Sequence, residues 1–254
     1  MRRQRGRIRE LAVHLTLRQL ASTHRFTVLG WAWPLTRQLA QLAVLVFLFS
    51  HVLDLHVHDY AVFVFAGLIS WSWFSTALDS ATSSLIANRH LVFQPRFPPA
   101  VLPVVAVAAG LVDVLIALPV LVVMLAISGD LAWTIVLLPL LFAVQFVLTC
   151  GVAWITSVAT VYLRDVRGIV AVGLTVLFYL TPVFYDVARV PHRYEWVLRL
   201  NPLTTLIDGY RALLLGSDFP SVARAAAVVA ASAALAAAGA ALFTRFSPGI
   251  VDEL

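Results

Sequence analysis

The chain has 254 residues, of which 61% are hydrophobic and 12% are charged. A soluble domain carries about a quarter charged residues, so too few polar side chains remain here to cover a globule in water. The composition therefore excludes an ordinary soluble domain and indicates an integral membrane protein.

The positive charge of the chain comes entirely from arginine, because the sequence contains no lysine. A phosphate-binding P-loop needs a lysine after its glycine-rich turn to reach the nucleotide phosphates. We therefore expect no ATPase site, no enzyme activity and no bound cofactor in this chain, with ATP and Mg held by a separate subunit. Cys150, the single cysteine, lies in an apolar run and is interpreted as a packing residue.

The N-terminal segment 7–26 predicts an amphipathic helix in the membrane interface. Apolar residues such as Leu11 and Leu15 recur at helical spacing, and Arg9 and Arg18 lie elsewhere on the helix. The basic residues 2–7 are not followed by the apolar core of a signal peptide. We therefore expect a retained cytoplasmic N-terminus.

Six apolar segments are long enough to cross a bilayer, which takes about 20 residues. They are residues 33–53, 60–78, 100–127, 131–163, 169–185 and 222–246. The third and fourth are long, and their prolines at 103, 119 and 139 predict tilted or broken helices rather than extra hairpins. Arginine is concentrated in the segments that this topology places inside, so both termini are predicted to be cytoplasmic. The expected fold class is an all-α membrane protein with six transmembrane helices.

Between the fifth and sixth spans, residues 190–216 predict two short amphipathic helices broken at Asn201-Pro202. Proline cannot continue the first helix, and each half is too short and too charged to span. We expect a pair of helices dipping into the outer leaflet, with an ordinary surface loop as the alternative. The sixth span is rich in alanine, which predicts close packing against a neighbouring helix.

Few ionisable residues lie inside the predicted spans. Asp113 is the deepest, and an intramembrane carboxylate suggests function. A structural pairing is favoured over ion coupling because a single buried carboxylate is thin support for a proton relay. Asp79 is expected at the cytoplasmic end of the second span. The histidines at 51, 56 and 58 in the first outer loop match no standard metal site, so we predict no metal.

Four motifs resemble the permease subunit of ABC-type polysaccharide exporters, the family that exports O-antigen, teichoic acid and capsule. They are HRFTVLGWAWPL at 24–35, FAGLISWSWF at 65–74 followed by Asn88 and Phe97-Pro98, YLRDVRGIV at 162–170 continuing to YLTPVFY at 179–185, and NPLT at 201–204 with Arg211 downstream. Their order and spacing carry the resemblance. The family often has serine where this chain has Thr181.

The resemblance implies the membrane subunit of an ATP-driven exporter of lipid-linked polysaccharide in the bacterial cytoplasmic membrane. A drug or small-lipid exporter of the same superfamily is the alternative. The implied partners are a second copy of the chain, two ATPase subunits, an undecaprenyl-linked glycan and membrane lipids, and no nucleic acid is expected. The whole chain, 1–254, would be one permease domain. Its parts would be an interfacial helix (1–29), spans one to five (30–185), outer gate helices (186–219), span six (220–246) and a cytoplasmic tail (247–254).

The resemblance also implies roles for individual residues. A coupling helix at 86–98 would contact the ATPase through Arg89, His90, Gln94 and Arg96, unless it is an ordinary loop. Aromatic side chains would line the glycan channel: Trp71, Trp73 and Phe74 on the second span, and Phe178, Tyr179, Phe184 and Tyr185 on the fifth. The alternative for aromatic residues is anchoring at the membrane interface. Arg25 and Arg37 would meet the lipid pyrophosphate near the cytoplasmic entrance. The alternatives are that they set the topology or contact anionic lipids. Asn201, Pro202 and Arg211 would belong to the outer gate.

Overall fold

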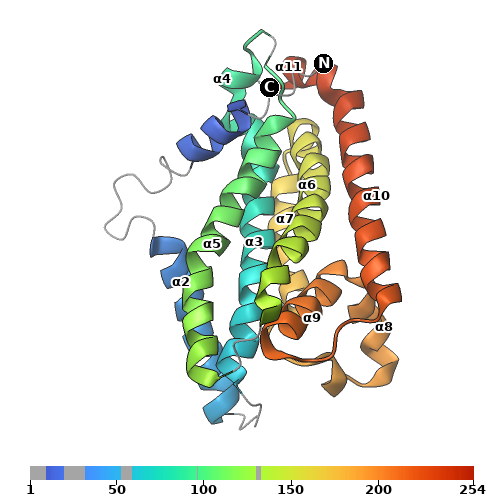
Figure 1. The fold of residues 1–254 in the computed structure, drawn as a ribbon. Coiled ribbons are helices and arrows are strands. Elements are labelled where there is room, and N and C mark those ends of the chain that lie inside the picture. Colours follow the sequence, from blue (N-terminus) through green and yellow to red (C-terminus); the bar gives the residue numbers. More distant parts are fainter. Residues whose placement is uncertain (1–9, 20–31, 53–58, 96, 130–132) are drawn as a thin grey trace.

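A computed structural model describes residues 10–19, 32–52, 59–95, 97–129 and 133–254. In these ranges the chain is helical and contains no strand (Figure 1). The helices are α2 (Trp33–Val46, continued by a π-helical turn Phe47–Val52), α3 (Tyr60–Ala87), α4 (Arg89–Val92), α5 (Val101–Ser128), α6 (Leu138–Tyr162, preceded by a 3₁₀ turn Trp133–Leu137), α7 (Val166–Leu180), α8 (His192–Leu200), α9 (Pro202–Leu215), α10 (Val222–Phe246) and α11 (Ile250–Glu253).

Four helices in the described ranges are long and apolar enough to cross a membrane. They are Tyr60–Ala87, Val101–Ser128, Trp133–Tyr162 and Val222–Glu253, and Val166–Leu180 is a shorter apolar helix. The all-α membrane class is therefore confirmed. The predicted count of six spans depends on α2 and α7, whose length alone does not establish a crossing.

Helix α3 forms the centre of the bundle and packs against α2, α5, α6, α7 and α9. Most of its residues are buried, from Tyr60 near its start to Leu85 near its end. It runs nine residues beyond the predicted end at residue 78, because the polar run Asp79–Ser84 supplies hydroxyls that bond back to carbonyls of the same helix. Such back-bonding keeps serine and threonine compatible with a helix.

The two ends of the bundle differ (Figure 1). One end of the bundle, at the ends of α3, α6 and α10, carries α4, α11 and the helical segment 10–19. There Leu15 packs against a buried apolar cluster that includes Leu91, Val161 and Ile250. At the other end, α8 and α9 lie on the α10 side of the bundle, and α9 packs against α3, α6 and α10. The segment 10–19 is helical as predicted, whereas its placement in a membrane interface stays a prediction.

The predicted coupling helix 86–98 is much shorter in the structure. Residues 86–87 complete α3, and the separate helix α4 covers Arg89–Val92 alone. The prolines at 95, 98 and 99 prevent a longer helix, because proline lacks the amide donor and disfavours helical backbone in the residue before it.

Close packing between α10 and α6 is confirmed. A methyl group added at Gly239 would lie 2.4 Å from the carbonyl oxygen of Gly151, and one at Gly151 would lie 2.6 Å from the backbone of Leu235 and Ala236. The two backbones therefore touch, which is the arrangement that small residues permit between membrane helices.

Candidate functional site

The turn that follows α7 is the point where the predicted motifs come together. The helix ends at Leu180 because Thr181 precedes Pro182 and adopts an extended backbone (φ −96°, ψ 131°). The hydroxyl of Thr181 donates a hydrogen bond of 2.6 Å to the carbonyl of Leu177. Phe184 and Tyr185, predicted to lie on the fifth span, therefore belong to this turn and not to the helix.

Asn201 connects this turn to the break between α8 and α9. Its side-chain oxygen accepts a hydrogen bond from the amide of Leu203 at 3.0 Å and so caps α9. Its side-chain nitrogen donates to the hydroxyl of Thr181 at 2.8 Å. Pro202 stands in the first turn of α9, where a missing amide donor costs little. Two short helices with a break at Asn201-Pro202 are present as predicted, and the break contacts the turn after α7. Their placement in the outer leaflet stays a prediction.

Arg211 holds the same turn from the interior of α9. Its side chain is 4% exposed. One guanidinium nitrogen donates to the carbonyl of Val183 at 2.7 Å and another to the carbonyl of Phe63 at 3.4 Å. The guanidinium carbon lies 3.5 Å from the centre of the Phe63 ring, a cation–π arrangement. Within the described residues no carboxylate forms an ion pair with Arg211, so its partners are carbonyl groups and an aromatic face.

Gly67 on α3 is what lets the turn approach this closely. A methyl group at Gly67 would lie 2.8 Å from the carbonyl oxygen of Val183 and 3.2 Å from the Arg211 guanidinium. Tyr60, the first residue of the same helix, donates a hydrogen bond of 2.8 Å to the carbonyl of Phe184. Residues of both α3 and α9 therefore contact the turn and hold it in place. Neither Gly67 nor Tyr60 was assigned a role from the sequence.

An aromatic cluster surrounds the turn. The ring centre of Phe178 lies 5.6 Å from that of Phe184, which lies 5.2 Å from that of Tyr185. Trp71 of α3 joins the cluster at 5.6 Å from Phe178. Tyr179 contacts Phe178 and is 64% exposed, so this ring offers a free face. Five of the seven predicted channel residues, Trp71 among them, therefore gather at one place.

Trp73 and Phe74 are buried within the chain. The indole nitrogen of Trp73 donates to the carbonyl of Val107 at 3.0 Å, and its ring meets Phe142 edge-on. With 1% of Trp73 exposed, its faces are covered by α5 and α6. Trp71 and Trp73 thus face different helices, as their spacing of two positions predicts.

The remaining predicted residues lie elsewhere. Arg89, His90 and Gln94 are exposed at the α4 end, where Leu91 and Val92 anchor α4 to the bundle. Arg37 is exposed on α2 beside Gln38, whose amide donates to Ser72 at 2.7 Å. This contact places Arg37 beside the middle of α3, and its role in meeting the lipid pyrophosphate stays a prediction. Arg25 and Arg96 lie outside the described residues.

A buried polar cluster was missed from the sequence. Gln145 of α6 is 0% exposed and accepts hydrogen bonds of 2.9 Å from both Ser70 of α3 and Tyr210 of α9. Its amide donates to the backbone carbonyl of Ser70 at 2.8 Å. An amide in the middle of an apolar span was the available signal, since buried polar groups need partners. The cluster ties α9 to the two central helices.

Comparisons with known proteins give consistent matches over most of the chain. Residues 10–215 match the family model of the ABC-2 type transporter. The O-antigen export system permease protein RfbA of Klebsiella pneumoniae is 30% identical over 213 residues, covering 83% of this chain and 82% of the relative. RfbA of Myxococcus xanthus is 30% identical over 215 residues, covering 84% and 83%. The polysialic acid transport protein KpsM of Escherichia coli is 22% identical over 202 residues, covering 76% and 77%.

Proposed function

The chain belongs to the ABC-2 type transporter family, and from that premise we propose that it is the membrane subunit of an ATP-driven exporter of lipid-linked polysaccharide. The observation that carries the proposal is similarity over more than four-fifths of the chain to permeases named for O-antigen export. A more distant relative is named for transport of another polysaccharide. These relatives favour glycan export over drug or small-lipid export.

The exporter works as a homodimer in this proposal, because a single chain has its interior filled by packed side chains. Helix α7 has no buried residue, and Val176, Tyr179 and Leu180 are exposed along it. A face of this kind suits a second copy of the chain better than lipid alone.

A polar strip on α3 supports a glycan path beside α7. Ser72, Thr76, Asp79 and Ser83 follow one another at intervals of three or four residues, and all are partly or fully exposed. Residues at this spacing share one face of a helix. Hydroxyl groups on this face and the exposed ring of Tyr179 provide a surface on which a sugar polymer can slide. Because this strip lies outside the packed core, we place the path between two copies.

The α4 end is the cytoplasmic side in this proposal, and six crossings of the bacterial inner membrane leave both termini there. The positive-inside rule supports this side, because Arg89, Arg164, Arg167 and Arg245 all lie near it. A separate ATPase subunit would bind the exposed residues Arg89, His90 and Gln94. The helical segment 10–19 would lie in the membrane interface beside it.

The opposite end carries the outer gate. Helices α8 and α9 are held by Asn201 and Arg211 to the turn after α7, so a movement of α7 is transmitted to both. In this proposal the pair of helices narrows the exit until the glycan passes. Re-entry of α8 and α9 into the outer leaflet follows from their amphipathic sequences and their short length.

The experiment is reconstitution of the chain with its ATPase in liposomes, measuring ATP hydrolysis and glycan export. Undecaprenyl-linked glycan should stimulate hydrolysis and appear in the lumen of inside-out vesicles. Arg89→Glu should keep basal hydrolysis and lose its stimulation, whereas Arg224→Glu at the opposite end should behave as the native chain. Export without an ATPase, or stimulation by drugs and not by glycan, would refute the proposed function. Chemical cross-linking between Cys residues placed at position 176 of two copies would test the dimer, and a monomeric active complex would rule it out.

A further inference from the structure

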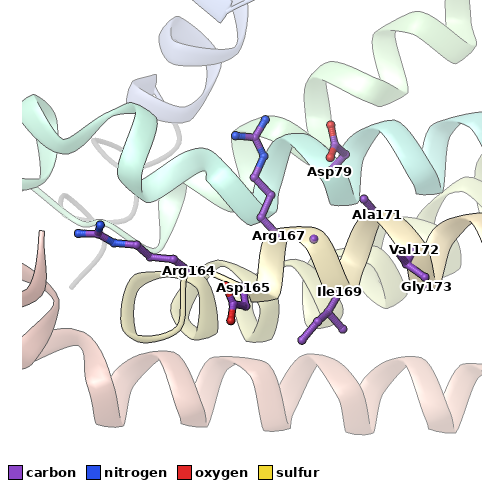
Figure 2. Close-up of a pocket in the computed structure, with 9 residues that line it drawn as sticks. Asp79, Arg164, Asp165, Arg167, Ile169, Ala171, Val172 and Gly173 are labelled. Atoms are coloured by element: carbon purple, nitrogen blue, oxygen red, sulfur yellow. The ribbon is translucent and has the colours of Figure 1, made fainter.

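A broad, open hollow lies where α7 begins, on the side of the bundle that meets α3 (Figure 2). Asp79 of α3 forms one wall. The start of α7 forms the rest, including Arg164, Arg167, Ala171 and Val172. Trp71 contacts Phe178 further along the same two helices, so α3 and α7 run antiparallel and the hollow lies toward the α4 end.

The hollow holds two guanidinium groups that the chain does not neutralise. Arg164 and Arg167 are exposed, and in the part of the chain that the structure describes neither makes an ion pair or a side-chain hydrogen bond. Asp165 lies between them in sequence and also lines the hollow, but Figure 2 shows its side chain pointing to the opposite side of α7 from Arg167. Asp165 stands at the start of α7, where a carboxylate interacts favourably with the helix dipole. Two guanidinium groups are therefore available to a ligand that carries more than one negative charge.

Asp79 and the apolar wall add two further kinds of contact. Figure 2 shows Asp79 and Arg167 on the same side of α7, with the small residue Ala171 beside them. An ionised carboxylate repels phosphate but accepts hydrogen bonds from hydroxyl groups, which a sugar presents in number. Val172, the residue after Ala171, is 65% exposed and supplies apolar surface. Groups that bind anions, a carboxylate that accepts hydrogen bonds from hydroxyl groups, and an apolar side chain thus lie within one hollow.

We propose that this hollow binds the head group of a polyprenyl diphosphate-linked sugar. Arg164 and Arg167 hold the diphosphate, a pairing for which the planar guanidinium is suited. Asp79 accepts hydrogen bonds from the first sugar, and Val172 contacts the first units of the hydrocarbon chain. The inference rests on the proposed function, because it takes the substrate to be a lipid-linked glycan, and it names the site on the cytoplasmic side where that substrate first binds.

An anionic phospholipid is the other source of phosphate for these arginines. A phospholipid such as phosphatidylglycerol has one phosphate and no pyranose ring, so it makes no use of Asp79 and little use of a second guanidinium. Binding that depends on both arginines, and on Asp79 when a sugar is present, therefore distinguishes the two ligands.

Thiol protection measures occupancy of the hollow directly. Gly173→Cys introduces a thiol in its lining where an added side-chain carbon meets nothing within 4 Å, and the native Cys150 is buried and slow to react. The full chain in nanodiscs is labelled with a maleimide while one lipid is titrated. The probes are undecaprenyl diphosphate, N-acetylglucosaminyl undecaprenyl diphosphate and phosphatidylglycerol.

We expect both diphosphate lipids to protect the thiol and phosphatidylglycerol to leave it reactive. Arg164→Gln with Arg167→Gln should raise the half-protecting concentration of both diphosphate lipids at least about tenfold, since both substitutions remove charge-assisted hydrogen bonds to the diphosphate. Asp79→Asn should raise it for the glycosylated lipid alone. The matched pair Arg193→Gln with Arg224→Gln, exposed arginines at the opposite end, should change nothing.

Equal protection by phosphatidylglycerol, or unchanged protection in the Arg164 and Arg167 double variant, would overturn the assignment of the hollow. Export of glycan by that variant at the native rate would leave the proposed function standing while the hollow loses its role. Absence of both protection and glycan-stimulated ATP hydrolysis in the chain without these substitutions would overturn the proposed function itself.

Discussion

Replacing Gly67 by alanine tests whether the turn after α7 is held against α3 by direct backbone contact. The new methyl group would lie 2.8 Å from the carbonyl oxygen of Val183, a separation that real side-chain carbons do not adopt. Because this neighbour is backbone, relief requires the turn or the helix to move. Overpacking of this kind costs about 1–3 kcal/mol.

The matched control is Gly173→Ala, which also replaces a helical glycine but meets nothing within 4 Å. Both changes gain about 0.5–1 kcal/mol of helix preference, so this gain cancels in the comparison. The Gly67 variant should therefore be about 1–3 kcal/mol less stable than the Gly173 variant.

The assay is reversible unfolding by SDS in mixed micelles, followed by circular dichroism, together with glycan export in vesicles. Export should fall with Gly67→Ala, because this substitution displaces the contact between Val183 and Arg211. Equal unfolding free energies, within about 0.5 kcal/mol, would refute the argument that the turn is pinned by contact at Gly67.

Three further predictions concern the contacts around the same helices. Gln145→Leu leaves the buried hydroxyl of Tyr210 without its acceptor and should lower the unfolding free energy by about 1–3 kcal/mol, measured by SDS titration; no loss would contradict the buried network. Asn201→Ala removes the cap of α9 and should speed amide exchange in its first turn, with a stability cost of about 1 kcal/mol; unchanged exchange would argue against the cap. The hydrogen bond from Arg199 holds the pKa of Glu195 below its ordinary value. The pairing therefore stabilises α8 at pH values above the pKa of the unfolded carboxyl, and this stabilisation is lost as the pH falls through the lower folded pKa. Amide exchange in α8 that is constant through this acidic range would count against the pairing.

Helix positions could be predicted well where composition alone decides them. The last span, 222–246, coincides with α10, because an uninterrupted apolar run has few ways to begin or end. The break at Asn201-Pro202 was equally predictable from proline chemistry. The end of α3 was not, because the sequence shows polar residues after position 78 and does not show that their hydroxyls bond within the helix.

The candidate site was predictable in its parts but not in its assembly. The motifs around Thr181 and Asn201 could be read from the chain, yet nothing in a linear sequence shows that these side chains lie 2.8 Å apart. Burial was the other missing quantity. Trp73 is an aromatic residue of the kind expected to line a channel, but its indole packs between α3, α5 and α6. The exposed polar strip lies on a different face of α3.

The contact between Gly151 and Gly239 has a consequence for biogenesis. Ribosomal synthesis reaches α10 after α3, α5 and α6, so the surface of α6 at Gly151 is complete, and lined by acyl chains, before its partner is made. When α10 docks, it displaces those acyl chains and packs so closely against α6 that no space remains for an added carbon atom. With a larger residue at either glycine, α10 should still insert into the membrane. It would not pack against α6, and the unpacked helix would be a substrate for membrane quality-control proteases.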